Sequence, residues 1–324
     1  MRVLLTGVDG FVGSHMAEFL VGLGGVDVFG ITITRDPGPN LESVRNRVRT
    51  FQADILDMGR IEELLTTIRP DRVIHLAAQA FVPTSVHDPL GTLSTNITGS
   101  TTMLEALRRV RDREGFDPSC IMVSSSEAYG RVEPEKQPIR EDLPLAPANP
   151  YAASKASVDL IAQAYRRTYD MNIIIARPFN HVGPRQAATF VCSEFGRRFS
   201  DFASGRSPAI LRTGNIATRR DFTDVRDVVR AYWAMMESPS DQFVFNVCSG
   251  TAYAISEIIA LYKEITGIDA TVVQQEAKSR HYDIPVLLGS SAMLRSATGW
   301  TPKIPLRQTL KDVFDYWQSH PDAS

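Results

Sequence analysis

Three glycines near the N-terminus, in the stretch TGVDGFVG at 6–13, constrain the fold of this chain more than any other feature. Gly7, Gly10 and Gly13 stand between the apolar run VLLT and the helical stretch FVGSHMAEFLVGL. Glycines at such a junction let the backbone turn tightly and approach a pyrophosphate, whose charge is favoured at a helix N-terminus. The motif predicts a dinucleotide site, and Phe11 and Val12 of the same turn are predicted to contact the cofactor.

Apolar, β-branched runs alternate with helical stretches through the first half of the chain. Strands are expected at 3–6, 26–32, 48–54, 72–78, 120–125 and 172–177, with helices at 11–23, 58–68, 89–113 and 150–169. Strands that are apolar on both faces and alternate with helices predict an α/β fold with a Rossmann-type doubly wound parallel sheet. After about residue 178, short strand-like pieces mix with helical stretches near 225–237, 254–266 and 305–318, which indicates a smaller C-terminal α/β lobe.

We expect these two lobes to pack closely, because no low-complexity linker separates them. Residues 1–178 are predicted to form the NADP-binding lobe, with contributions from about 213–250. Residues 179–324 are predicted to form mainly the substrate-binding lobe.

Composition excludes several classes of partner. The formal net charge is −2 with no long run of one sign, so neither nucleic acid nor a membrane surface is an expected partner. No apolar run approaches the length of a membrane span, and the first residues reach glycine too soon for a signal peptide. Cys120, Cys192 and Cys248 lie 72 and 56 residues apart, a spacing typical of neither a disulfide framework nor a metal site. We therefore expect a cytoplasmic protein with reduced thiols and no metal.

The end of the second predicted strand bears on the choice of cofactor. NAD sites usually place Asp or Glu there to bind the ribose 2′-hydroxyl. Here the stretch GITITRD offers Thr32, Thr34 and then Arg35, which can pair with a 2′-phosphate. The sequence favours NADPH, while NADH remains open because Arg35 can equally be a solvated loop residue. Topology adds further expected cofactor contacts after the third and fourth strands: Asp54, Ile55, Leu76, Ala77 and Ala78.

Tyr151 and Lys155 in NPYAASK are the second strong motif. Asn149 can cap a helix whose first turn accommodates Pro150, and residues four apart share one helix face. A free tyrosine has a pKa near ~10, and a neighbouring ammonium favours the phenolate. We therefore expect Lys155 to lower the pKa of Tyr151 and make it a usable acid or base.

The glycine motif, the serine-ended strand VSSSEAYG and Tyr-x-x-x-Lys, in this order, resemble the extended short-chain dehydrogenase/reductase family over essentially the whole chain. The resemblance implies that Ser125, four residues before Tyr129, is the catalytic hydroxyl. It also implies that Ser126 touches the substrate.

Further stretches resemble the branch of this family that acts on GDP-linked deoxyhexoses, among them ARPFNHVGPRQAATFV, RRDFTDVRDVV and RHYDIP. The resemblance implies substrate contacts from Asn180, Phe190, Val191, Arg220, Arg280 and Asp283. Arginine supplies a fork that matches phosphate, although each arginine taken singly can equally form a surface salt bridge. His181 is more simply read as a hydrogen-bonded structural residue than as a proton donor.

Glu127 separates two reactions on this scaffold. Reduction of the C4 ketone of a GDP-4-keto-6-deoxyhexose by NADPH needs Ser125, Tyr151 and Lys155 and no further base. A 4,6-dehydratase needs an additional acid/base, and its branch carries a glutamate two residues after the catalytic hydroxyl, where Glu127 stands. The serine at the hydroxyl position and the segment FNHVGPRQAATFV favour the reductase, whereas the dehydratases typically have threonine and a segment like FNHESPRRGETFV. A catalytically silent binding module stays open as an alternative, although the motifs are intact.

The helical stretches at 89–113 and 151–169 carry apolar residues on more than one face. In the family, the matching helices pair across a dimer. The resemblance therefore predicts a homodimer.

Overall fold

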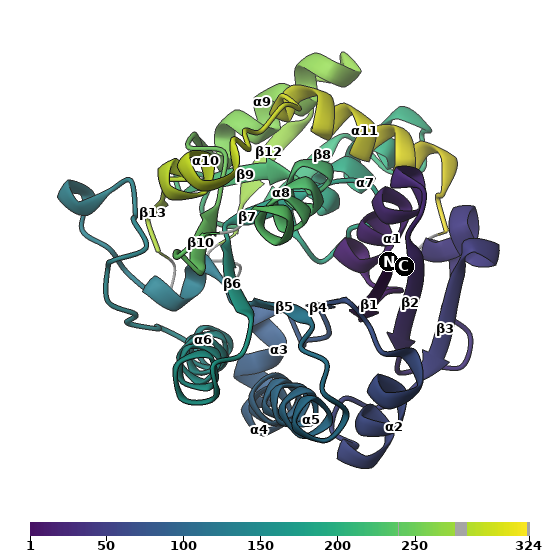
Figure 1. Cartoon of the computed structure of the whole chain (residues 1–324). Helices are drawn as coiled ribbons and strands as arrows, with labels where there is room; N and C mark the ends of the chain where they lie inside the picture. The colour runs from purple at the N-terminus through teal and green to yellow at the C-terminus, as the bar shows by residue number, and fades with distance from the viewer. Residues whose placement is uncertain (239, 276–283, 323–324) are drawn as a thin grey trace.

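A seven-stranded parallel sheet forms the centre of the molecule in the computed structural model, which describes residues 1–238, 240–275 and 284–322 (Figure 1). Its order is β10-β6-β5-β4-β1-β2-β3, so the chain winds outward in both directions from β1. The strands are β1 (Arg2–Thr6), β2 (Asp27–Thr32), β3 (Val48–Gln52), β4 (Arg72–His75), β5 (Ser119–Val123), β6 (Ile173–Pro178) and β10 (Val244–Val247). The predicted doubly wound parallel sheet is confirmed.

Helices cover both faces of this sheet because the strands are apolar on both faces. Val3 and Leu5 of β1 pack on one side with α1 (Phe11–Leu23), α8 (Val225–Glu237) and α10 (Ala292–Thr298). Leu4, whose side chain points the other way, packs with α2 (Met58–Ile68), α5 (Gly99–Glu114) and α6 (Pro150–Tyr169). Figure 1 shows these two helical layers, with α2, α5 and α6 below the sheet and α1 and α8 above it.

The segment predicted as one helix at 89–113 is divided in the structure. After α3 (Val82–His87) it forms α4 (Pro89–Leu93), a wider π-helical turn at Ser94–Thr98 and then α5. Asn96 in this turn is buried and donates from Nδ2 to the Gln79 carbonyl at 3.0 Å and to Ser154 Oγ at 2.8 Å. Its Oδ1 accepts the amide N–H of Gln79 at 2.8 Å. The turn therefore ties the helix to the loop after β4 and to α6, contacts that periodicity alone does not report.

The second lobe is smaller and mixed, as predicted. Its four-stranded sheet contains β7 (Asn180–Val182), β9 (Arg219–Asp224), β11 (Ala252–Ala254) and β13 (Val286–Leu287), and a separate pair joins β8 (Ile210–Thr213) to β12 (Thr271–Gln274). Three helices cover it, α7 (Val191–Ala203), α9 (Ile255–Thr266) and α11 (Leu306–Ser319). Phe195, Phe199, Tyr262 and Trp317 form the centre of its core. The helix α7 was not anticipated from the sequence.

Three 3₁₀ segments are also present among the described residues. They are the 3₁₀ turns η1 (Pro39–Arg47), η3 (Ser126–Tyr129) and η4 (Pro134–Lys136). Among the helices of the described residues, none has both the length and the apolar character that crossing a membrane requires.

Candidate active site

A cleft of about 780 Å³ lies where the carboxyl ends of the parallel strands meet the second lobe. It brings together residues from the glycine turn, the serine-ended strand, the Tyr-x-x-x-Lys helix and the stretches resembling the GDP-sugar branch. The predicted residues that line it are Gly7, Gly10, Phe11, Val12, Gly13, Leu76, Ala78, Ser125, Ser126, Glu127, Tyr151, Lys155, Asn180, Phe190, Val191 and Arg220. This is the crevice in which open α/β sheets bind their ligands.

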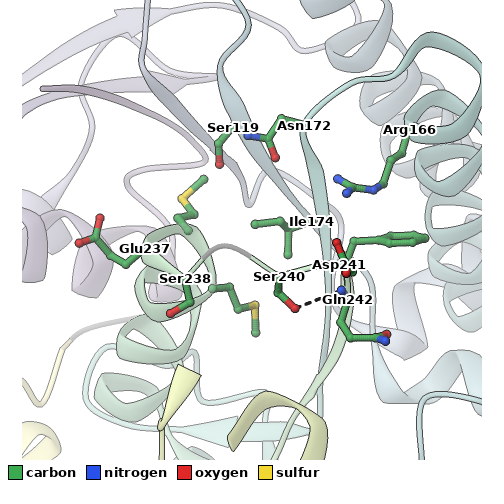
Figure 2. Close-up of a pocket in the computed structure, with 12 residues that line it drawn as sticks. Ser119, Arg166, Asn172, Ile174, Glu237, Ser238, Ser240, Asp241 and Gln242 are labelled. Atoms are coloured by element: carbon green, nitrogen blue, oxygen red, sulfur yellow. Dashed lines mark hydrogen bonds between the residues drawn. The ribbon is translucent and has the colours of Figure 1, made fainter. Parts of the chain in front are cut away.

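A second cavity, of about 570 Å³, lies at the other end of the strands, where they begin. Figure 2 shows the residues that line it. Ser119 at the start of β5 and Asn172 just before β6 line it, together with Arg166, whose guanidinium lies 4.7 Å from the centre of the Phe243 ring. It contains none of the glycine, serine or Tyr-x-x-x-Lys residues. Its position at the amino ends of the strands argues against a role in the same chemistry.

The glycine turn fits a pyrophosphate because its backbone has no room for side chains. Gly7 has φ +64°, a conformation that favours glycine, and its amide N–H donates to the Ile31 carbonyl at 2.9 Å. A Cβ on Gly13 would lie 2.1 Å from the carbonyl oxygen of Gly7. The first turn of α1 can therefore approach the Gly7 loop closely and point its free amides at an anion.

Four predicted cofactor residues do not line the cleft. Ala77 lies beneath the glycine turn, with its Cα 3.0 Å from where a Cβ on Gly7 would be. Ile55 is buried against Gly99, and Asp54 is exposed and accepts the amide N–H of Leu56 at 2.9 Å. Arg35 is exposed on the loop after β2. Two predicted substrate residues, Arg280 and Asp283, lie outside the described residues.

The serine-ended strand presents its hydroxyls at the cleft floor. Ser125 caps the η3 turn, and its Oγ accepts the amide N–H of Glu127 at 3.2 Å, which leaves the hydroxyl hydrogen free for another acceptor. The hydroxyl of Ser124 points elsewhere and donates to the Lys155 carbonyl at 3.1 Å. Of the three serines, the positions therefore favour Ser125 for contact with a reacting oxygen.

Tyr151 and Lys155 stand one turn apart on α6, which begins as predicted with Asn149 accepting the Ala152 amide at 2.8 Å and Pro150 in the first turn. Burial raises the pKa of Tyr151 to about 12, and this outweighs the lowering by its hydrogen bond with Ser125. The negative charge of Glu127 raises this pKa further. The predicted lowering of the Tyr151 pKa by Lys155 is therefore wrong, because desolvation of the phenolate dominates.

Lys155 is also buried, and burial lowers the pKa of its ammonium to about 8. Its Nζ donates to the Val123 carbonyl at 2.9 Å, which fixes the side chain against the end of β5. Near neutral pH, the site thus holds a protonated phenol beside a largely protonated ammonium. Such a pair can donate a proton to an oxygen in the cleft.

A buried polar network behind the site joins α6 to the sheet. Asp159, two turns after Tyr151, accepts from Arg177 Nε at 2.7 Å and from its second terminal nitrogen at 2.9 Å. The other terminal nitrogen of Arg177 donates to Tyr129 Oη at 2.8 Å, and that hydroxyl donates to Asn246 Oδ1 at 2.8 Å. The pair is almost fully buried, with 4% and 0% of the two side chains exposed. The network connects α6, which carries Tyr151 and Lys155, with the turn that carries Glu127.

The cleft also contains polar residues that the sequence reading missed. Tyr232 of α8 is fully buried, lines the cleft, and its hydroxyl has no hydrogen-bond partner among the described residues. Gln186 also lines the cleft, and its Oε1 is buried without a partner in the described part of the chain, while Nε2 donates to the His181 carbonyl at 2.9 Å. Phe81 packs edge to face on Phe190 at 5.6 Å. Of these missed residues, only Gln186 lies in the stretch GPRQAATFV, which the sequence analysis had singled out.

His181 is placed as the sequence reading preferred. Its Nδ1 lies 3.1 Å from the Phe179 carbonyl, and burial lowers the pKa of the ring below its ordinary value. The ring stacks on Phe11, with 5.9 Å between the centroids. These contacts fit a structural histidine at the cleft wall.

A glycine turn after the first strand, a serine-ended fifth strand and a Tyr-x-x-x-Lys helix in one cleft define an extended short-chain dehydrogenase/reductase. The model of the GDP-mannose 4,6 dehydratase family matches residues 4–313. GDP-6-deoxy-D-mannose reductase of Pseudomonas aeruginosa is 34% identical over 318 residues, covering 98% of this chain and 97% of the relative. The chain therefore belongs to the GDP-mannose 4,6-dehydratase family of oxidoreductases.

Further similar proteins are named for different activities. A GDP-mannose 4,6-dehydratase of Vibrio cholerae is 28% identical over 355 residues, covering 96% of this chain and 92% of the relative. The solved structure of RMD from Pseudomonas aeruginosa complexed with NADPH has a TM-score of 0.84 at 32% identity, covering 98% and 99% of the two chains. UDP-glucose 4-epimerase from Thermotoga maritima gives 0.88 at 29% identity, covering 99% and 100%.

Proposed function

We propose that this protein uses NADPH to reduce the C4 ketone of a GDP-4-keto-6-deoxyhexose, giving a GDP-6-deoxyhexose such as GDP-D-rhamnose. The observation that carries the proposal is the protonated, buried Tyr151, hydrogen-bonded to Ser125 in the cleft that the glycine turn opens. A ketone reduction needs a proton donor at that point. The likeness to a GDP-6-deoxy-D-mannose reductase supports the same substrate class.

The chain's own residues supply everything except the hydride. Bound NADPH provides that hydride to C4, and the glycine turn, which no side chain fills, fits its pyrophosphate. Ser125 donates its hydroxyl hydrogen to the ketone oxygen and polarises the carbonyl. Tyr151 transfers its proton to the oxygen as the C4–H bond forms, so the ketone gains two electrons and two hydrogens. Lys155, fixed to the Val123 carbonyl, lies one turn along and stabilises the phenolate that remains.

The substrate end of the cleft suits a nucleoside diphosphate sugar. Arg220 lines it, and one terminal nitrogen of its guanidinium donates to the Ile284 carbonyl at 2.6 Å and to the Arg219 carbonyl at 2.9 Å. A guanidinium at this wall has the fork geometry that matches phosphate. We assign Asn180, Ser126, Phe190 and Val191 to the sugar and nucleotide, as the family resemblance implies. The roles of Arg280 and Asp283 in holding phosphate and nucleoside stay predictions.

A second candidate reaction is GDP-mannose 4,6-dehydration with Glu127 as the additional base. Its support is positional, because Glu127 stands two residues after Ser125, lines the cleft and acts electrostatically on Tyr151. A Vibrio cholerae relative with this activity is less similar in sequence than the reductase. We therefore prefer the reductase.

One assay in two arms tests the choice. The first contains GDP-4-keto-6-deoxymannose with NADPH and is followed by NADPH absorbance. The second contains GDP-mannose with catalytic NADP⁺ and is followed by mass spectrometry for loss of water. We expect stoichiometric NADPH consumption in the first arm only, and loss of water in the second arm would assign the dehydratase instead.

A third reading, a silent binding module, predicts a different response of Tyr151→Phe. If the protein is an enzyme, this change lowers turnover by at least about 10²-fold, since a general acid contributes on that scale. Cofactor affinity measured by NADPH fluorescence stays close to the wild-type value. The absence of any wild-type turnover on either substrate would favour the binding module.

We also propose that the protein prefers NADPH to NADH, because Arg35 can bind the 2′-phosphate. We further propose that the boundary between the cofactor-binding and substrate-binding lobes lies at about residue 178. A homodimer in the cytoplasm completes the proposal. Its support is a set of exposed apolar side chains on three neighbouring helices: Val86 of α3, Leu90 of α4 and Leu160 of α6, which are 46%, 78% and 58% exposed. Sedimentation at micromolar concentration tests it, and a monomer there would contradict the dimer.

A further inference from the structure

Arg185 lies in the segment between β7 and α7, and its side chain leaves the second lobe to reach the dinucleotide-binding lobe. One terminal nitrogen donates to Glu18 Oε1 at 2.7 Å, and the other donates to Glu18 Oε2 at 2.6 Å. The second nitrogen also lies 2.8 Å from His15 Nδ1. Both His15 and Glu18 belong to α1, the helix that opens in the glycine turn. The side chains of Arg185 and Glu18 are 14% and 33% exposed, so this two-pronged ion pair is partly shielded from solvent.

The same guanidinium continues towards the glycine turn itself. Its first terminal nitrogen donates to the Asn40 carbonyl at 3.1 Å, and Asn40 Nδ2 donates to the carbonyl of Asp9 at 2.9 Å. Asp9 stands inside the motif, between Gly7 and Gly10. A continuous set of hydrogen bonds thus runs from the cofactor turn through Asn40 to Arg185.

The residues that follow Arg185 in the chain form part of the cleft wall. The next residue is Gln186, and Phe190 and Val191 follow a few residues later, all of which line the cleft. The backbone at Pro184 is held as well, because its carbonyl lies 2.9 Å from His15 Nε2. Residues 183–191 are therefore fastened to α1 at two adjacent points, and the stack of Phe11 on His181 adds a third contact between the lobes.

The backbone of Arg185 is in the left-handed region, with φ +71°. Non-glycine residues reach this region at a cost that surrounding contacts must offset. An ion pair on a loop with ordinary backbone would suffice to fasten two lobes. The bonds of the guanidinium to Glu18 and its contact with His15 can offset that cost.

We propose that Arg185 is a positioning residue that couples the glycine turn to segment 183–191. Binding of the dinucleotide to the turn then orders this segment, which forms the substrate side of the cleft. The inference rests on the proposed binding of NADPH in the glycine turn. It assigns to Arg185 a role that neither the motifs nor a contact with reacting atoms would indicate. Its consequence is that cofactor and substrate bind cooperatively, on the scale of about 5- to 150-fold that such coupling usually reaches.

Hydrogen–deuterium exchange with and without NADPH tests this without needing the substrate. In the wild-type protein we expect NADPH to slow exchange both in the glycine turn and in a peptide covering 183–191, by about fivefold or more in the latter. Arg185→Lys and Glu18→Gln each remove the two-pronged pair. Both should keep the protection of the glycine turn and lose that of 183–191.

Ser43→Ala is the matched control. Ser43 Oγ donates to the same Glu18 carboxylate at 2.5 Å but does not touch segment 183–191, so this variant should keep both protections. Exchange in β4 and β5 reports whether each variant remains folded, and Glu18→Gln keeps the test available if Arg185→Lys does not fold. Protection of the glycine turn without any effect at 183–191 in the wild type, or equal transmission in all variants, overturns the coupling. No protection of the glycine turn in the wild type overturns the proposed cofactor binding and the coupling with it.

Discussion

Gly13→Ala tests whether the glycine turn is shaped for a cofactor or only for folding. The added Cβ would lie 2.1 Å from the Gly7 oxygen, 2.8 Å from the Val8 Cα and 2.9 Å from the Gly7 carbonyl carbon. All three neighbours are backbone atoms, so no side-chain rotation relieves the contact. The Gly7 loop and the start of α1 must separate by about 1 Å, and a displacement of that size near a binding site lowers performance about 10²-fold. We expect NADPH affinity, measured by fluorescence titration, to fall by about that factor.

Gly22→Ala on the same helix is the control, because a Cβ there meets nothing within 4 Å. It should leave NADPH affinity unchanged and raise the free energy of unfolding by about 0.5–1 kcal/mol, the usual gain from replacing a helical glycine. The contrast separates a local clash from a general effect of alanine in α1. If Gly13→Ala binds NADPH within about threefold of Gly22→Ala, the steric reasoning is wrong.

Three further changes probe the site and its support. Glu127→Gln should leave ketone reduction within a few-fold of wild type, because a reductase needs no base there, and steady-state kinetics with NADPH measure it. Asp159→Asn should lower the free energy of unfolding in urea by about 3–5 kcal/mol, because it leaves the buried Arg177 cation without its partner. For His15, burial and Arg185 lower the pKa to about 4. In the unfolded chain His15 is protonated below about pH 6.5, whereas in the folded protein it is protonated only below about pH 4. The free energy of unfolding therefore decreases as the pH falls from about 6.5 to about 4, by about 3 kcal/mol from this group. His15→Gln should make the urea-derived stability less dependent on pH between these values.

Each of these has a result that would contradict it. A loss of about a hundredfold or more in Glu127→Gln is the scale of a lost acid/base and would point to the dehydratase. Asp315→Asn, which breaks the exposed pair with Lys311, should change stability by less than about 1 kcal/mol. If Asp159→Asn lowers the free energy of unfolding by no more than Asp315→Asn does, the buried ion pair contributes no more to stability than the exposed one. A parallel pH dependence in wild type and His15→Gln would refute the assigned pKa.

Local patterns located most of the dinucleotide-binding lobe. The helices at 11–23, 58–68 and 150–169 begin and end as predicted, because their caps and periodicity are encoded in adjacent residues. The division of 89–113 was missed, because it depends on Asn96 bonding to Gln79 and Ser154. Edge strand β10 pairs with β6 although 65 residues separate Pro178 from Val244. The sequence predicted a contribution from about 213–250 to this lobe, but no local pattern predicted this pairing.

The candidate site likewise combines features that adjacent residues encode with features that depend on distant residues. Gly7, Ser125, Tyr151 and Lys155, which the structure brings to one cleft, could be proposed from the sequence because each belongs to a short motif with fixed spacing. The effect of their surroundings could not, and the expected lowering of the Tyr151 pKa was reversed because burial is a property of the assembled cleft. The ion pair between Arg185 and Glu18 joins residues 167 apart in the chain. The hydroxyl of Tyr232, which has no hydrogen-bond partner among the described residues, reaches the cleft from a helix that was predicted but not placed at the site.

The sequence by itself determined the kind of fold, the glycine turn and the residues that we propose for catalysis, since these follow from hydrophobic periodicity, backbone freedom and residue chemistry over a few neighbouring positions. Only the tertiary structure decided how those side chains are charged, what holds them, and how the two lobes are fastened. The physical reason is that desolvation, ion pairing and orphaned hydrogen-bond groups depend on atoms brought together from distant parts of the chain.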